Sequence, residues 1–116
     1  MPFKNTGTLL LHLDGRIVFA STYFCDLVDI DHDKASGMSY FDFVFPEEME
    51  EAKNQMETCK FVVPPPYFRK LRTSKGAPVW VAIQCSPLQT AAGETYAVSA
   101  AITAAQQPVN GNAEKR

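Results

Sequence analysis

The N-terminal part of the chain contains two short apolar runs that an Asp-Gly pair separates. Thr8–Leu13 is rich in leucine, and Arg16–Ala20 follows with β-branched and aromatic residues. A tight turn between two strands needs a positive φ, which glycine adopts without steric cost. Asp14-Gly15 therefore predicts a β-hairpin.

Helical signals follow the hairpin. Ser21 can cap a short helix, because its hydroxyl can accept a hydrogen bond from an unpaired backbone amide. The inner face of that helix would carry Phe24, Leu27 and Val28. Asp31 can begin a further helical turn, which Gly37 ends.

A longer helix is predicted to begin at Pro46-Glu47-Glu48. Proline fits the first helical turn, and the glutamates complement the positive end of the helix dipole. The inner stripe of this helix is Met49, Ala52, Met56 and Cys59, at the spacing typical of core packing. Pro64-Pro65-Pro66 must end the helix, because proline disrupts helical hydrogen bonding.

The last third of the chain predicts three strands, at about Tyr67–Arg72, Val79–Leu88 and Thr95–Thr103. In the second of these, residues alternate as in a strand with one buried face. The inward set is Val79, Val81, Ile83 and Cys85. Trp80 then lies on the opposite face, where a partner can cover its apolar area.

This order of elements indicates an α+β domain with a five-stranded antiparallel sheet. Short helices and one longer helix would pack on one face of the sheet. A chain of 116 residues fits one domain and leaves no room for a separate output domain. We expect residues 1–7 to be a lead, 8–104 the domain and 105–116 a polar, disordered tail.

Composition and charge narrow the possible functions. Apolar residues make up 46% of the chain, which is enough to build a core. The net charge is -2, without a long run of one sign, so nucleic acid and anionic membranes are disfavoured partners. Cys25, Cys59 and Cys85 are widely spaced, which indicates reduced, buried thiols. Leu9-Leu10-Leu11 is too short for a signal or membrane segment, and the predicted location is the cytoplasm.

Several short motifs stand in order along the chain. They are Asp14-Gly15-Arg16-Ile17 with Ala20-Ser21 and Phe24; Gly37 with Phe41, Phe43, Val44 and Pro46-Glu47-Glu48; and Thr73-Ser74-Lys75-Gly76 with Val79-Trp80-Val81 and Ser86-Pro87-Leu88. Together they resemble a PAS domain, the sensory and dimerisation module of many signalling proteins. The likeness runs from about Thr8 to Thr103.

The chain departs from the family pattern at three places. Ser21 stands where an asparagine is usual, and Ser74-Lys75-Gly76 stands in place of a Lys-Asp-Gly turn. Both changes are conservative in local geometry. Ala101 replaces the acid that usually precedes Ile102-Thr103, so the charged anchor that often couples a PAS domain to a following helix is missing.

The resemblance implies a cavity between the longer helix and the sheet, in which some members hold haem, a flavin or a small metabolite. The cysteinyl-flavin branch needs a reactive cysteine next to Gly37, where this chain has Met38-Ser39-Tyr40-Phe41. A haem sensor would carry an axial histidine on the longer helix, but the two histidines are His12 and His32. Cysteinyl-flavin photochemistry and a histidine-ligated haem are therefore both disfavoured, and the identity of any ligand stays open.

An acidic cluster raises the question of a metal site. Asp29, Asp31 and Asp33 alternate beside His32. As a calcium loop the run fails at its sixth and twelfth positions, which are Lys34 and Tyr40. We interpret these carboxylates as helix caps and solvated charge, and we predict no metal site.

Arg69 is the main candidate for ligand binding, and two strand registers remain open. If Tyr67, Arg69 and Leu71 face inward, the guanidinium points to the cavity and can hold a carboxylate-bearing ligand through two bonds. The opposite register turns Phe68 inward and leaves Arg69 in water. A slip of one residue exchanges the two faces of a strand, so the sequence does not choose between the registers.

The predicted function combines these candidates. The candidate lining of the cavity is Phe41, Val44, Met56, Cys59, Arg69, Val81, Ile83, Cys85 and Val98. No catalytic motif is present, so we predict a non-enzymatic intracellular module that binds a small ligand or a partner. It would relay its state through the sheet surface to a second copy of the chain or to an effector. The alternative is a small ligand carrier or enzyme with a conical pocket, in which His12 or Asp14 transfers protons.

Overall fold

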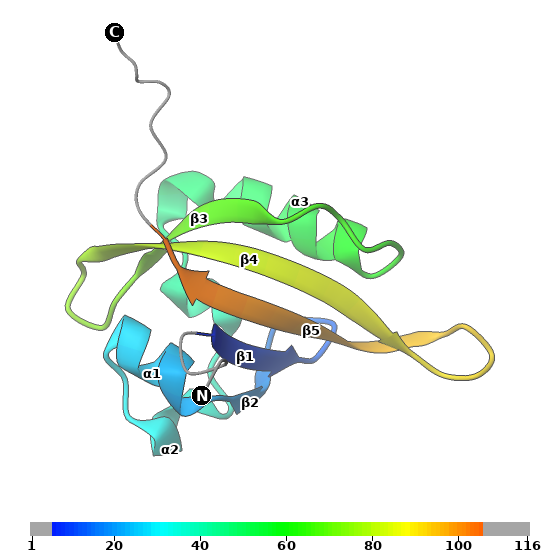
Figure 1. The fold of residues 1–116 in the computed structure, drawn as a ribbon, viewed down its shortest axis with the longest axis horizontal. Helices are drawn as coiled ribbons and strands as arrows, with labels where there is room; N and C mark the ends of the chain where they lie inside the picture. Colours follow the sequence, from blue (N-terminus) through cyan, green and yellow to red (C-terminus); the bar gives the residue numbers. More distant parts are fainter. Residues whose placement is uncertain (1–5, 106–116) are drawn as a thin grey trace, which may run out of the picture.

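A computed structural model describes residues 6–105 as a five-stranded antiparallel sheet with its helices on one face (Figure 1). The strands are β1 (Thr6–Leu11), β2 (Ile17–Ala20), β3 (Tyr67–Arg72), β4 (Pro78–Gln89) and β5 (Thr95–Ala104). The helices are α1 (Thr22–Val28), α2 (His32–Ala35) and α3 (Met49–Cys59), with 3-10 turns η1 (Tyr40–Phe43) and η2 (Pro46–Glu48). The predicted α+β class is confirmed.

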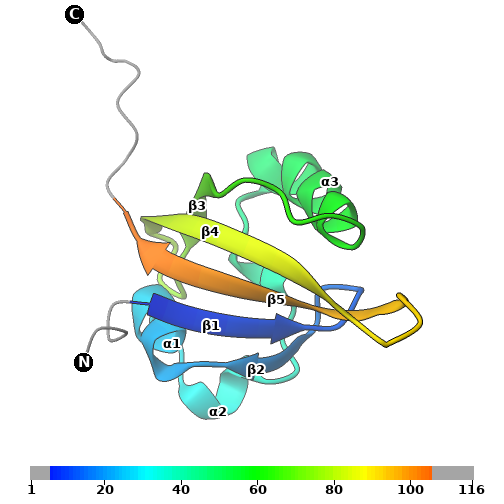
Figure 2. The same cartoon turned by 45° about the vertical axis from the view of Figure 1, so that its right-hand side comes forward.

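The strand order places the first and the last strand side by side. The order is β2-β1-β5-β4-β3, and β1 pairs with β5 from Thr6 opposite Thr103 to Leu11 opposite Val98. The helices all belong to the connection from β2, at one edge, to β3, at the other. In Figure 2, α1 and α2 lie behind β1 and β2, and α3 lies on the side of β3 and β4. No helix formed by residues 6–105 lies on the opposite face of the sheet.

β1 begins at Thr6, so Thr6 and Gly7 belong to the strand and not to the predicted lead. Gly7 marks a close approach of α1 to β1. A Cβ atom on Gly7 would lie 3.0 Å from Cδ2 of Tyr23 and 3.1 Å from the backbone nitrogen of Phe24. At the other end, Ala105 of the predicted tail donates a backbone hydrogen bond to the Trp80 carbonyl (2.9 Å). The remaining predicted lead (1–5) and tail (106–116) lie outside the described residues.

Local signals set the starts of the helices. The Ser21 hydroxyl accepts a hydrogen bond from the Phe24 backbone amide (3.5 Å) and caps α1, as predicted. α2 follows Asp31, although that carboxylate makes no capping hydrogen bond. The helix predicted from Pro46 begins as the 3-10 turn η2, and α3 proper begins at Met49. A tighter first turn of this kind is common at helix ends.

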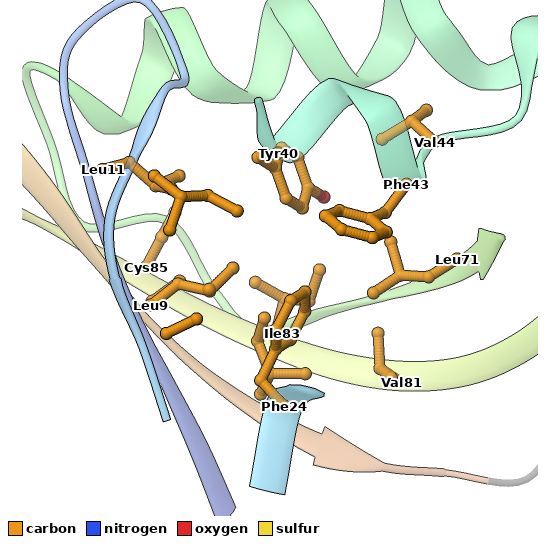
Figure 3. Close-up of a cluster of buried hydrophobic side chains, with 14 of the residues drawn as sticks. Leu9, Leu11, Phe24, Tyr40, Phe43, Val44, Leu71, Val81, Ile83 and Cys85 are labelled. Carbon is orange, nitrogen blue, oxygen red and sulfur yellow. The ribbon is translucent and has the colours of Figure 1, made fainter. Parts of the chain in front are cut away.

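The inner face of the sheet and the helices enclose one hydrophobic cluster (Figure 3). Val81, Ile83 and Cys85 of β4 are buried, which confirms the predicted alternation. Phe24 of α1 and Phe43 of η1 pack edge to face, with ring centroids 5.6 Å apart. The cysteines are free and buried, as predicted: Cys25, Cys59 and Cys85. Within residues 6–105, no helix is long and apolar enough to cross a membrane.

We expect Gly15→Ala to destabilise the protein more than Gly76→Ala. Both glycines have a positive φ, of +93° and +87°. A Cβ on Gly15 would also lie 2.6 Å from Cε2 of Phe41, whereas nothing lies within 4 Å at Gly76. The expected loss of unfolding free energy in urea is about 2–3 kcal/mol for Gly15→Ala and about 1 kcal/mol for Gly76→Ala. Equal losses would contradict a packing role for Gly15.

Candidate ligand site between α3 and the sheet

A small cavity lies between α3 and the inner face of the sheet. Its lining comes from β1, η1, α3 and the three C-terminal strands: Leu11, Tyr40, Ala52, Met56, Tyr67, Ile83, Cys85, Val98 and Ala100. Its volume is about 20 Å³, which holds about one water molecule. Pockets for drug-sized ligands measure roughly 300–1,000 Å³. A flavin or a haem would therefore fit only if the core opened.

Part of the predicted lining surrounds this cavity. Met56, Ile83, Cys85 and Val98 line it, whereas the other predicted residues do not: Phe41, Val44, Cys59, Arg69 and Val81. In Figure 3, Val44, Leu71 and Val81 lie on the opposite side of the cluster from Leu11 and Cys85. Alternation identifies the inner face of a strand but not the position along it, so Val81 lies on the predicted inner face of β4 but away from this cavity.

Other lining residues were missed by the sequence reasoning. Leu11 and Ala100 lie on inner strand faces, so the alternation of β1 and β5 was a usable signal for them. Ala52 belongs to the predicted stripe of α3. Tyr40 lies in the 3-10 turn η1, where no periodic pattern marks an inner face.

The structure decides the register of β3. Arg69 is 2% exposed and Leu71 is fully buried, whereas Phe68 is 56% exposed. The guanidinium of Arg69 therefore points inward, but protein groups already bind it. Its Nη1 lies 3.2 Å from Oε1 of Glu48, and its Nη2 donates to Oε1 of Gln55.

Two buried polar atoms of this cluster have no hydrogen-bond partner among the described residues. They are Nε of Arg69 and the hydroxyl oxygen of Tyr40. Burial raises the pKa of Tyr40 to about 12, and the nearby Arg69 charge partly opposes this. At neutral pH the Tyr40 hydroxyl is therefore protonated and able to donate a hydrogen bond.

The Cys59 thiol, which neighbours Cys85 of the cavity lining, is not activated. Burial, with a smaller contribution from the neighbouring Cys85 thiol, raises the pKa of Cys59 to about 12. Burial also raises the pKa of the Tyr67 hydroxyl. A protonated thiol is a poor nucleophile and a poor metal ligand, so the arrangement suits packing or ligand contact rather than covalent chemistry.

The residues proposed for proton transfer lie away from this cavity. His12 and Asp14 are both exposed, in the turn that joins β1 and β2. Asp14 accepts a hydrogen bond from the Arg16 amide (3.0 Å), which lowers the pKa of its carboxyl group. Between Thr6 and Ala105, no three His, Cys, Asp or Glu side chains gather in a way that could hold a metal ion.

The sheet surface that faces away from the helices is uncharged over its three central strands. We define this outer face by Thr8 and Leu10 of β1, Ala82, Gln84 and Ser86 of β4, and Ser99, Ala101 and Thr103 of β5. Ala101 lies at its centre, between Thr8 and Gln84 of the neighbouring strands. The exposed rings of Phe19 and Phe68 flank it at the two edges of the sheet.

Trp80 occupies a corner of the same side. It pairs with Lys70 of β3, and its side chain is half-buried rather than exposed. Alternation against the buried Val81 places it on the predicted side of β4. Phe19 and Phe68 present more open apolar area than Trp80, and sequence reasoning did not identify either of them as an interface residue.

Comparison with known proteins decides the family. A family model described as "PAS domain" matches residues 5–103. The chain is a PAS domain. This confirms the resemblance that its motifs indicated, and PAS domains generally serve as sensory or signalling modules. No curated protein matches the chain.

Solved PAS domains share the fold at low sequence identity. The PAS domain of an HTR-like protein from Haloarcula marismortui has a TM-score of 0.72 and 16% identity, over 89% of this chain and 85% of that one. The PAS domain of the fruit-fly ELK potassium channel has a TM-score of 0.71 and 19% identity, over 89% and 90%. Drosophila melanogaster Cycle PAS-B with bound ethylene glycol has a TM-score of 0.72 and 10% identity, over 84% and 98%.

The departures from the usual PAS motifs preserve local hydrogen bonding. Ser21, in place of asparagine, accepts a hydrogen bond from the Thr8 amide (2.9 Å) as well as from Phe24. In the β3–β4 turn, the Ser74 amide donates to the Val28 carbonyl (2.9 Å). Both residues therefore tie α1 to the sheet of this PAS domain.

The free energy of unfolding is expected to fall as pH rises above about 10. The pKa of Tyr40 rises from 10.0 to about 12 on burial, so in this interval the unfolded chain loses a proton that the folded protein keeps. Rising pH then favours unfolding, by up to about 2 kcal/mol for this one group. Urea unfolding from pH 9 to 12 should give a flatter curve for Tyr40→Phe than for the wild type. The exposed Tyr96 provides the control Tyr96→Phe, and equal slopes for both variants would contradict the assignment.

Proposed function

We propose that this PAS domain is a sensory and interaction module that binds a small ligand or a partner. It relays the bound state through its outer face to a second copy of the chain or to an effector. One observation carries the proposal: β4 has the cavity on one side and the outer face on the other. Ile83 and Cys85 line the cavity, and Gln84 between them belongs to the outer face. A shift of β4 that makes room for a ligand therefore also moves outer side chains.

A second copy of the chain is the partner that best suits the outer face. Small uncharged residues make this surface flat, and two-fold apposition would place the same uncharged patch on both sides. Phe19 and Phe68 at its margins add apolar area that pairing would remove from water. Desolvating this face costs little, because no charged group lies at its centre.

The proposed module has no catalytic activity of its own. The alternative of a proton-transferring enzyme needs His12 or Asp14 in a pocket, but both side chains are exposed in a turn. The raised pKa of Cys59 likewise disfavours a nucleophilic thiol. Three free, buried cysteines support a reducing compartment, and we propose that the domain works in the cytoplasm.

Ala101→Arg tests the outer face as the dimer surface. The substitution puts a charge at the centre of the face in both copies, which adds repulsion and a desolvation cost. We expect the dimer dissociation constant in analytical ultracentrifugation to rise about tenfold or more. Ala92→Arg, in the exposed β4–β5 turn, should behave like the wild type. A dimer that Ala101→Arg leaves intact would contradict pairing through this face.

Native mass spectrometry of the protein purified from cells tests ligand binding and subunit number together. We expect two chains per particle and a bound small molecule. Ethylene glycol in Cycle PAS-B is a small guest, and the cavity here likewise has room only for a small one. A ligand-free monomer would contradict the proposed sensor.

A further inference from the structure

Arg69 and Tyr40 together form an incomplete polar site in the core. Their side chains are 2% and 6% exposed, and each has one polar atom without a partner among the described residues. Tyr40 lines the cavity, and the guanidinium of Arg69 lies 5.6 Å from the ring centroid of Tyr67, which also lines it. Nε of Arg69 is a hydrogen-bond donor, and the protonated Tyr40 hydroxyl can donate as well as accept. A buried donor without an acceptor is costly, so the site favours a guest that supplies acceptor atoms.

Glu48 and Gln55 both bind the Arg69 guanidinium from half-buried positions, and of the two only Glu48 carries a charge. Glu48 ends η2, and its side chain is 24% exposed, so its carboxylate can turn into water. The side chain of Arg69 is confined by the core. A buried guanidinium requires a counter-charge, and Glu48 supplies it from the rim of the site. Glu48 is therefore the partner that an incoming anion can replace.

On the basis of the proposed ligand-binding function, we propose that the cavity takes a short-chain carboxylate, such as acetate or propionate. Its carboxylate replaces that of Glu48 on Arg69 and accepts a hydrogen bond from the Tyr40 hydroxyl. Nε and Nη2 of a guanidinium can bind both oxygens of a carboxylate side by side, which gives the unpartnered Nε its acceptor; the Nη1 contact of Glu48 is then given up for charge balance. The cavity of about 20 Å³ receives the methyl end.

The charge balance favours this exchange over simple addition. A second carboxylate beside Glu48 would leave two negative charges on one guanidinium in a poorly hydrated site. If Glu48 turns outward, one cation still faces one anion, and Glu48 regains its hydration. A neutral guest of the same shape cannot replace Glu48, because it would leave the Arg69 charge unbalanced.

Replacement of Glu48 by a carboxylate ligand also weakens the attachment of α3, the helix that covers the cavity. Glu48 immediately precedes α3, and its ion pair joins the start of this helix to β3. When Glu48 leaves Arg69, the surface pair of Glu47 and Lys70, at 3.5 Å, remains between the same two segments. Binding of a carboxylate therefore loosens the start of α3, and amide hydrogen exchange in its first turn should become faster.

The test is an NMR titration of the folded protein with sodium acetate and, separately, with acetamide at constant ionic strength. The backbone amides of Cys85 and Val98 report on the cavity. Glu48→Gln keeps the shape of the side chain and removes the competing charge, so acetate should bind about tenfold more tightly than to the wild type. A gain in affinity cannot result from misfolding. Glu51→Gln, at an exposed position of α3, is the matched control and should not change the affinity.

Two further variants complete the test. Tyr40→Phe should weaken acetate binding about fivefold, because it removes one donor, and Arg69→Met should abolish it. The exchange would be overturned if Glu48→Gln had the same affinity for acetate as the wild type, or a lower one. It would also be overturned if the wild type bound acetamide as tightly as acetate. If acetamide alone shifts the Cys85 and Val98 signals, the carboxylate assignment is wrong and ligand binding by the cavity stands. If Ala101→Arg weakens the dimer but acetate does not bind, only the exchange is overturned, and pairing through the outer face stands.

Discussion

The pairing of β1 with β5 is the constraint on which the rest of the structure depends. It joins the first strand to the last, from Thr6 opposite Thr103 to Leu11 opposite Val98, and so places both in the middle of the sheet. β2 and β3 become the edges, and the chain between them must cross one face of the sheet. The helices therefore cover that face and leave the other open (Figure 1). The cavity and the uncharged outer face both result from this topology.

The buried charge of Arg69 is the main exception to the apolar core. Burying a guanidinium is costly unless acceptors surround it, and among residues 6–105 the groups bonded to it are Glu48 and Gln55. The same contacts connect β3 to η2 and α3, so this polar cluster holds the helix over the cavity. The Tyr40 hydroxyl, whose pKa burial raises and the Arg69 charge partly lowers, adds a second buried polar group to this cluster. Among the described residues, the buried polar atoms without a partner thus belong to the same part of the core as the small cavity that Tyr40 lines.

The closeness of the packing limits the size of a molecule that the cavity can hold. A void for about one water admits a small molecule or requires the core to open, and each carries a cost in lost contacts. β4 and β5 carry cavity residues and outer residues in alternation, so such a change has a direct route to the outer face. The flat, uncharged centre of that face, Ala101 with its neighbours, is where a small strand displacement would alter the fit to a partner.

The sequence alone determined the hairpin, the cap at Ser21, the three C-terminal strands and the inner face of β4, because turn residues and alternation are local signals. It also determined the family, through motifs whose order spans the domain. It left the face of β3 open, because a slip of one residue exchanges Arg69 and Phe68 and both patterns look plausible along the strand. Only the tertiary structure brought Glu48 and Gln55 to Arg69, put Tyr40 beside the cavity and reduced that cavity to about 20 Å³. These features depend on how η1, η2 and α3 pack across the sheet, and packing between segments distant in sequence has no local signature.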